Sequence, residues 1–295
     1  MPLHIHDHGG DGPPLLLLHG AGRSLADWDA VAPLLTPYHR VLAADLPAHG
    51  RSSDPSGDEP WSFDATTAAV EAALRAHDAP DAILVGHSLG GMIAVRYAAE
   101  HPGATPGVVN LDGLWWGSPQ EYAGEERESV VRLGEMTRAT AGQVAPPEFI
   151  EQQAAYAGQF GIPYARAEAA ARAAVHQLPY GRWQTLPERE RSLEMLDALD
   201  ALELFAEMRR LACPLLVVRA RRPQPPMPGM EWFDKLIETH ARRMDEELAA
   251  LVNERPTAAT RDMDATHAML LEEPESVAEC VLEFGRLCGG IDESY

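Results

Sequence analysis

The chain has 295 residues, of which 45% are hydrophobic and 23% charged, a composition typical of a globular protein with one large or two small domains. Its 24 basic and 45 acidic residues give a net charge of −21, so nucleic acid and anionic membranes are poor partners. No apolar run approaches the roughly 18 residues of a membrane-spanning helix, and the N-terminus lacks a signal-peptide pattern. We therefore expect a cytoplasmic protein.

Short apolar segments bounded by Gly, Pro or Asp alternate with helical patterns along the chain. Continuous apolar runs of this length are typical of strands covered on both faces of a parallel sheet. We expect strands at Pro14–Leu18, Arg40–Ala44, Asp81–Val85, Val108–Leu111, Leu215–Val218 and Ala258–Met263. Helical spacing of apolar residues appears within 63–74, 89–97 and 274–288, the last opened by Pro274. This order predicts an α/β fold with a doubly wound, mostly parallel sheet.

The segment from 114 to 210 breaks this alternation, because it contains helical patterns but no convincing strand. We expect a helical lid over 114–210, inserted into a core domain formed by 1–113 and 211–295. The insertion holds 10 of the chain's 19 aromatic residues. Some of them must pack the lid itself, and the excess suggests an inner face that meets an apolar ligand. The candidate substrate-binding residues of the lid are Trp115, Trp116, Tyr156, Tyr164 and Trp183.

The segment Gly86-His87-Ser88-Leu89-Gly90-Gly91 follows a predicted strand and precedes a predicted helix. A serine on such a tight turn is held in strained backbone geometry, which only small neighbours permit. Its hydroxyl then points into the cleft above the sheet, at a helix N-terminus whose partial positive charge favours an anion. Ser88 is therefore the candidate nucleophile.

A serine hydroxyl needs a base, and His267 is the candidate among twelve histidines. It follows the last predicted strand, so its loop opens on the same edge of the sheet as Ser88. His176 and His240 fall in helical stretches and are expected at the surface or in the lid. The turn His19-Gly20-Ala21-Gly22 can aim backbone amides at the cleft. The N–H groups of Ala21 and Leu89 are the candidate oxyanion donors, unless the turn is an ordinary glycine turn.

These motifs, in this order, resemble the α/β-hydrolase superfamily. The segment Asp45-Leu46-Pro47-Ala48-His49-Gly50-Arg51-Ser52 is similar to the D-x-P-G-x-G-x-S segment after the fourth strand of that fold, with Ala48 in place of the usual glycine. The resemblance covers nearly the whole chain and implies a sheet domain with a lid inserted where lids of this family occur. It implies no particular substrate.

The third member of the expected triad departs from the family's commonest pattern. The acid often follows the seventh strand, but residues 217–223 hold no carboxylate, and Glu231 and Asp234 lie in or near the next helix. Asp112 follows the preceding strand, a position similar to that of the acid in haloalkane dehalogenases and zearalenone-type lactonases. The resemblance implies that Asp112 orients His267. The alternative is a turn-forming Asp before Gly113.

Metal and cofactor sites are not indicated. His4-Ile5-His6-Asp7-His8 is similar to the metal motif of metallo-β-lactamase-like hydrolases but lacks one spacer and has no partner histidines, so a solvated face of an edge strand is expected. Cys213, Cys280 and Cys288 have no zinc-like spacing and are too few for a disulfide framework. A proline-rich turn spans residues 222–229, and no phosphate loop or dinucleotide fingerprint is present.

The sequence thus predicts a serine hydrolase that cleaves a small apolar or aromatic carboxylic ester or lactone through an acyl-enzyme, as a monomer or homodimer. A serine nucleophile argues against dehalogenase or epoxide-hydrolase chemistry, which uses aspartate in similar folds. Two alternatives stay open. One keeps the acyl-enzyme but changes the bond or acceptor, as in a thioesterase, amidase, acyltransferase or carbon–carbon bond hydrolase for a bulky natural-product intermediate. The other is a ligand-binding protein without turnover.

Overall fold

The computed structural model describes residues 3–53, 59–223 and 229–289, so most of the proline-rich turn lies outside the described residues. A seven-stranded sheet forms the centre of the molecule, in the order β1-β3-β2-β4-β5-β9-β10. Its strands are β1 (Ile5–Gly9), β2 (Pro14–Leu18), β3 (Arg40–Ala44), β4 (Ile83–His87), β5 (Val108–Leu111), β9 (Leu215–Ala220) and β10 (Ala258–Met263). Edge strand β1 pairs antiparallel with β3, and all other pairs are parallel. The predicted α/β fold with a mostly parallel sheet is confirmed.

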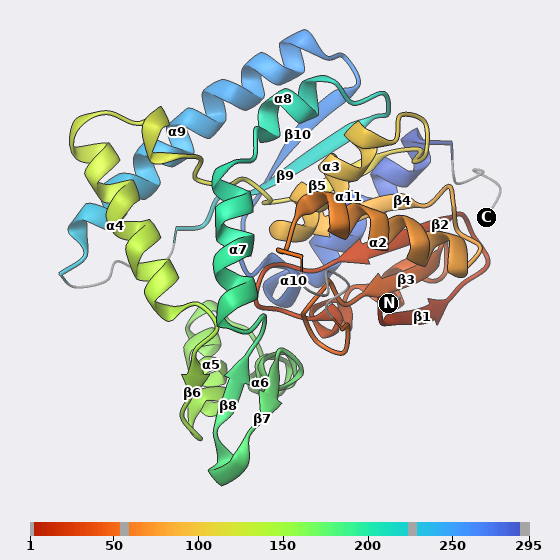
Figure 1. Cartoon of the computed structure of the whole chain (residues 1–295). Coiled ribbons are helices and arrows are strands. Elements are labelled where there is room, and N and C mark those ends of the chain that lie inside the picture. The colour runs from red at the N-terminus through yellow and green to blue at the C-terminus, as the bar shows by residue number, and fades with distance from the viewer. Residues whose placement is uncertain (1–2, 54–58, 224–228, 290–295) are drawn as a thin grey trace.

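Helices cover both faces of the sheet (Figure 1), which explains the continuous apolar strands. Along β2, Leu16 and Leu18 face one core, whereas Leu15 and Leu17 face the other. The first core is closed by α2 (Phe63–Ala76), α3 (Leu89–Glu100), α8 (Leu204–Arg209) and α9 (Glu231–Glu254). The second is closed by the 3₁₀ turn η1 (Leu25–Trp28), α1 (Ala32–Leu35), α10 (Met269–Glu272) and α11 (Pro274–Leu287).

The segment from 114 to 210 contains, besides α8, four further helices, α4 (Gly124–Thr140), α5 (Phe149–Ala157), α6 (Tyr164–Ala173) and α7 (Arg189–Asp200). It also forms a small sheet, in the order β6-β8-β7, from β6 (Val144–Ala145), β7 (Val175–Gln177) and β8 (Trp183–Thr185). The prediction that this segment holds no strand is therefore wrong. Each of these strands has only two or three residues, too few for a period-2 pattern to appear in the sequence.

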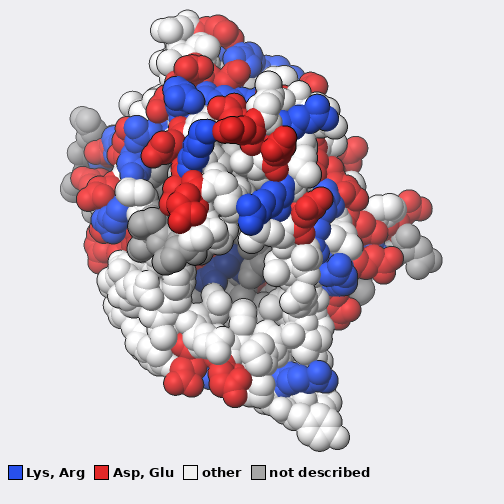
Figure 2. All heavy atoms as spheres, turned by 90° about the vertical axis from the view of Figure 1, so that its left-hand side faces the viewer, with Lys and Arg blue, Asp and Glu red and all other residues white. Residues whose placement is uncertain are grey.

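Several contacts attach this segment to the sheet domain, among them Met195, Leu196 and Leu199 of α7, which pack into the first core. Val130 of α4 packs with Leu236 of α9, and α4 lies beside α9 in Figure 1. Ala154 of α5 and Ala167 of α6 pack against Leu271 of α10. Figure 2 shows a hollow in the face that carries α4, with mostly uncharged atoms below it and basic atoms at its floor. Within the described part of the chain, no helix combines the length and apolarity needed to cross a bilayer.

Candidate active site

Ser88 lies on a strained turn between β4 and α3. Its backbone has φ 53° and ψ −119°, a combination that is sparsely populated for residues with a side chain. The Ser88 N–H donates to the carbonyl of Leu111 at 2.9 Å, which ties the turn to the end of β5. A Cβ at Gly86 would collide with the backbone of Gly90 and Gly91, so this turn requires glycine at position 86. The local sequence thereby holds the Ser88 hydroxyl above the sheet.

His267 lies beside Ser88, in the loop between β10 and α10. Its Nε2 is 3.1 Å from Ser88 Oγ, and its Nδ1 is 2.7 Å from Asp112 Oδ2. The loop is fixed on two sides. Thr266 donates its N–H to Glu272 Oε2 at 2.7 Å, and His87 donates Nε2–H to the carbonyl of His267 at 2.8 Å. The three residues predicted from the sequence therefore form a continuous hydrogen-bonded row.

Asp112 emerges from β5 in a left-handed conformation, with φ 51°. Its Oδ1 accepts from the N–H of Ala220 at 3.1 Å, and its own N–H donates to the carbonyl of Val218 at 2.7 Å. The side chain of Asn110 closes the turn, because it exchanges two hydrogen bonds with the backbone of Gly113. Neighbouring strands β5 and β9 thus position this carboxylate together.

The electrostatic environment keeps Asp112 ionised. Burial raises the pKa of Asp112, but the hydrogen bonds from His267 and from the N–H of Ala220 outweigh burial and hold this pKa below its usual value of 3.8. An ionised carboxylate can only accept hydrogen bonds, so Nδ1 of His267 carries the proton. The Nε2 lone pair of His267 then faces the Ser88 hydroxyl, as a general base requires.

His87 contributes a second, neutral imidazole to the site. Burial, together with the nearby His267, lowers the pKa of His87 to about 3. The centres of the His87 and His267 rings are 4.8 Å apart. Because His87 stays neutral at physiological pH, it does not repel a positive charge on His267.

The glycine turn after β2 lies against the serine. A Cβ at Gly20 would lie 3.2 Å from Ser88 Cβ, which is a tight contact, so the glycine turn packs closely against the serine. Two hydrogen bonds fix the turn, from His19 Nδ1 to the Gly20 carbonyl at 2.8 Å and from the Gly22 N–H to His49 Nε2 at 3.1 Å. Ala21 lines the same cavity as Ser88. Leu89 is the first residue of α3, so its N–H has no acceptor within the helix.

Ser88 and His267 open into a cavity of about 260 Å³. Its remaining walls are mostly apolar and come from α5, α6, α10 and the loops beside them, together with Arg23 and Asp27 at η1. Tyr156, one of the five candidate residues of the lid, lines this cavity. The other walls include Ala157, Phe160, Ile162, Ala167, Ala171, Leu270 and Leu271.

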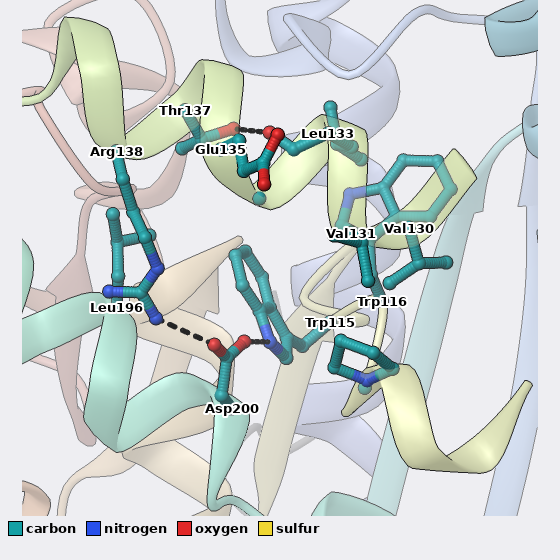
Figure 3. Close-up of a pocket in the computed structure, with 13 residues that line it drawn as sticks. Trp115, Trp116, Val130, Val131, Leu133, Glu135, Thr137, Arg138, Leu196 and Asp200 are labelled. Carbon is teal, nitrogen blue, oxygen red and sulfur yellow. Dashed lines mark hydrogen bonds and ion pairs between the residues drawn. The ribbon is translucent and has the colours of Figure 1, made fainter. Parts of the chain in front are cut away.

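Trp115 and Trp116 line a different cavity, of about 280 Å³, between α4 and α7 (Figure 3). The Trp115 indole N–H donates to Asp200 Oδ1 at 3.2 Å, and Arg138 binds the other oxygen of Asp200 at 2.7 Å. None of the residues that line this cavity also lines the cavity of Ser88. These two tryptophans therefore lie outside the serine cavity, although they follow Asp112 closely in the sequence.

Tyr164 and Trp183 also lie outside the residues that line the serine cavity. Tyr164 is half exposed at the start of α6, and the indole N–H of Trp183 donates to the carbonyl of Pro147 at 3.1 Å. The expected helical position of His176 is wrong, because this residue lies on β7. His240 does lie on a helix, but its ring packs on Trp116 with 4.3 Å between ring centres, and burial lowers its pKa to about 4.

The N-terminal histidine segment runs from His4 into β1, which begins at Ile5. His4 Nδ1 is 3.0 Å from Asp45 Oδ2, so this histidine has a structural partner. Among the described residues, no group of three or more His, Cys, Asp or Glu side chains is arranged to hold a metal ion. Asp45 also accepts from the N–H groups of Leu25 and Arg51, which gives the Asp45–Ser52 segment a bracing role beside the glycine turn.

This fold and the arrangement of Ser88, His267 and Asp112 are those of an α/β hydrolase. Residues 13–159 match the model of the alpha/beta hydrolase fold family, and the chain belongs to this superfamily. Its solved structural neighbours include E-2-(acetamidomethylene)succinate hydrolase, with a TM-score of 0.72 and 22% identity over 96% of this chain and 94% of that one.

Two curated relatives show similarity over shorter segments. A fluoroacetate dehalogenase of Burkholderia is 39% identical over 107 residues, and the pimeloyl-[acyl-carrier protein] methyl ester esterase of Vibrio campbellii is 38% identical over 94 residues. These matches cover 35% and 32% of this chain, and 35% and 34% of the relatives. The similarity therefore spans about a third of each relative.

Sequence reasoning missed one pair of charged residues in the serine cavity. Arg23 and Asp27 both line it, and Arg23 stands two residues after Ala21. The spacing of four between a basic and an acidic residue was a visible signal for an ion pair. Its position beside the glycine turn became apparent only with the fold.

Proposed function

We propose that the protein is a serine hydrolase that cleaves a carboxylic ester or lactone through an acyl-enzyme. The observation that carries this proposal is the hydrogen-bonded row from Ser88 Oγ through His267 to Asp112. Ser88 Oγ attacks the acyl carbonyl while His267 Nε2 takes the hydroxyl proton. Asp112 holds the required tautomer of His267 and stabilises the imidazolium that forms.

Release of the alcohol completes acylation, and hydrolysis of the acyl-enzyme then uses the same groups. His267 gives its proton to the leaving alkoxide, and a water molecule, deprotonated by His267, then attacks the acyl-enzyme and releases the acid and Ser88. The N–H groups of Ala21 and Leu89 hold the oxyanion in both tetrahedral intermediates. The N–H of Leu89 is well suited to this role because it is free at the N-terminus of α3.

The cavity favours a small substrate with an apolar part that contacts α5, α6 and α10, and we propose no metal, organic cofactor, nucleic acid or membrane as a partner. One matched relative is a dehalogenase. In dehalogenases of similar fold, an aspartate is the nucleophile that displaces the halide, whereas this chain has Ser88. An acyl-enzyme therefore agrees better with this site.

Labelling with an uncharged fluorophosphonate probe, read by intact mass, tests the triad. We expect one label on the native protein, none on Ser88→Ala, and much slower labelling of Asp112→Asn. Glu231→Gln is the matched control, because this exposed carboxylate begins α9 and should not affect Ser88.

A panel of esters, lactones, thioesters and amides then identifies the bond that is cleaved. Normal labelling of Asp112→Asn would refute the role of Asp112. Acid release from a thioester or amide alone would refute the ester or lactone proposal while keeping the acyl-enzyme. Absence of both labelling and turnover in the native protein would refute hydrolase function and favour a binding protein.

A further inference from the structure

Arg23 is a charged side chain in an otherwise mostly apolar cavity. Among the described residues that line the cavity of Ser88 and His267, it is the only lysine or arginine. Arg23 follows the glycine turn directly and is separated from Ala21 by one residue. Its positive charge helps to lower the pKa of both His19 and His87, after the larger effects of burial and of neighbouring histidines, so its guanidinium lies near the site.

The guanidinium of Arg23 is held in one orientation by Asp27. Nε donates to Asp27 Oδ2 at 2.8 Å, and Nη2 donates to Asp27 Oδ1 at 2.6 Å. Asp27 is buried, with 3% of its surface exposed, so its carboxylate holds the Arg23 guanidinium in a fixed position. A guanidinium has five N–H donors, and Asp27 takes two of them. The edge formed by Nη1 and the second N–H of Nη2 has no other acceptor among the described residues.

We propose that this free edge binds a carboxylate of the substrate, which makes the enzyme selective for esters that also carry a carboxylate near the scissile bond. This inference rests on the proposed function and adds the substrate class. Two parallel N–H groups match the two oxygens of a carboxylate, and a charge-assisted pair of this kind is stronger inside a cavity than in water. A neutral ester leaves these donors unpaired, which disfavours it.

The contact itself, rather than long-range attraction, gives this selectivity. Asp27 cancels much of the charge of Arg23 at a distance, and the net charge of −21 on the whole chain does not attract anions. Recognition therefore requires the planar edge at short range. A lysine at position 23 would keep the charge but lose this edge, so it should not restore the selectivity.

Matched pairs of substrates test the proposal. Monoethyl esters of straight-chain C4 to C6 dicarboxylic acids are compared with their ω-carboxamide analogues, which have nearly the same shape without the charge. We expect kcat/KM of the native protein to favour the best acid over its amide by about tenfold or more. This ratio should fall to near one in both Arg23→Gln and Arg23→Lys. The matched control Arg75→Gln removes an exposed arginine of α2 and should keep the native ratio.

Two further measurements separate the possible failures. Fluorophosphonate labelling of Ser88 shows that each variant is folded, and the double variant Arg23→Gln/Asp27→Asn avoids a buried unpaired carboxylate. Calorimetric binding of monoethyl adipate and its amide to Ser88→Ala tests recognition without turnover. The proposal would be overturned if the acid-to-amide ratio of kcat/KM were the same in the native protein and in Arg23→Gln. Equal affinity of Ser88→Ala for the acid and the amide would also overturn it. Selective binding that depends on Arg23, without turnover by the native protein, would support the anion site and refute only the hydrolase function.

Discussion

His49 allows a quantitative prediction, because its hydrogen bonds define one protonation state. Its ring is fully buried, Nδ1 lies 2.8 Å from the carbonyl of Pro47, and Nε2 accepts from the N–H of Gly22. A carbonyl can only accept and an N–H can only donate, so the ring is neutral with its proton on Nδ1. Burial lowers the pKa of His49 from 6.5 to about 4.

This lowered pKa links protein stability to pH. Because the unfolded chain binds the proton more readily, the contribution of His49 is complete above pH 6.5 and is lost as the pH falls from 6.5 towards 4. A pH of 5 is about 1.5 units below the pKa of the histidine in the unfolded chain, which corresponds to a loss of about 2 kcal/mol in the free energy of unfolding. The folded form is still mostly neutral at that pH, so it offsets little of this loss.

The test compares urea denaturation of the native protein and His49→Gln at pH 8 and pH 5. A glutamine at this position can still accept from the N–H of Gly22 but does not titrate. The free energy of unfolding should fall by about 2 kcal/mol less in the variant between the two pH values. The difference between the pH-dependent changes of the two proteins removes the effect of the groups that titrate in both. The same pH-dependent loss in both proteins would refute the argument that His49 is held neutral.

Three further predictions follow from packing and burial. Gly86→Ala should abolish labelling of Ser88, because the new Cβ collides with the backbone of α3. Gly134→Ala has open space on α4 and should raise the free energy of unfolding by about 0.5–1 kcal/mol. Arg96→Ala should lower the free energy of unfolding by about 2–3 kcal/mol, because it leaves the buried carboxylate of Glu207, 4% exposed, to the more distant Arg210 at 3.7 Å. A thermal or urea melt checks both stabilities, and a loss below about 1 kcal/mol would contradict the buried-pair argument. Trp183→Ala should lower the free energy of unfolding by about 1–2 kcal/mol, because a hydrogen bond and packing are lost. It should leave the substrate preference unchanged. A changed preference with unchanged stability would instead place the Trp183 ring in the path of the substrate.

The sheet and the serine row could be predicted because local signals specify them. The leucines of β2 are apolar at every position, since both faces of the strand are buried. The turn at Ser88 needs glycine at fixed offsets, which is visible in a sequence. Asp112 could be assigned because parallel neighbours end at the same edge of a sheet, and the structure places it beside Ala220 at the end of β9.

The remainder depends on contacts that a sequence does not encode locally. Helix α4 has 17 residues of which only Val130 is buried, so its apolar spacing was too weak to predict it. Trp115 and Trp116 were expected in the substrate site because the insertion is rich in aromatic residues, but they line the separate cavity between α4 and α7. Arg23 was overlooked because nothing in its neighbours shows that the loop after β2 borders the lid.

The hydrogen bond from Ala220 to Asp112 has a consequence for how freely the sequence of this site can change. At the end of β9, the site needs a backbone N–H and no side chain, and nineteen of the twenty amino acids supply that group. Only proline lacks it. Position 220 is therefore open to variation, so a library of side chains at this position should leave the row from Ser88 to Asp112 intact.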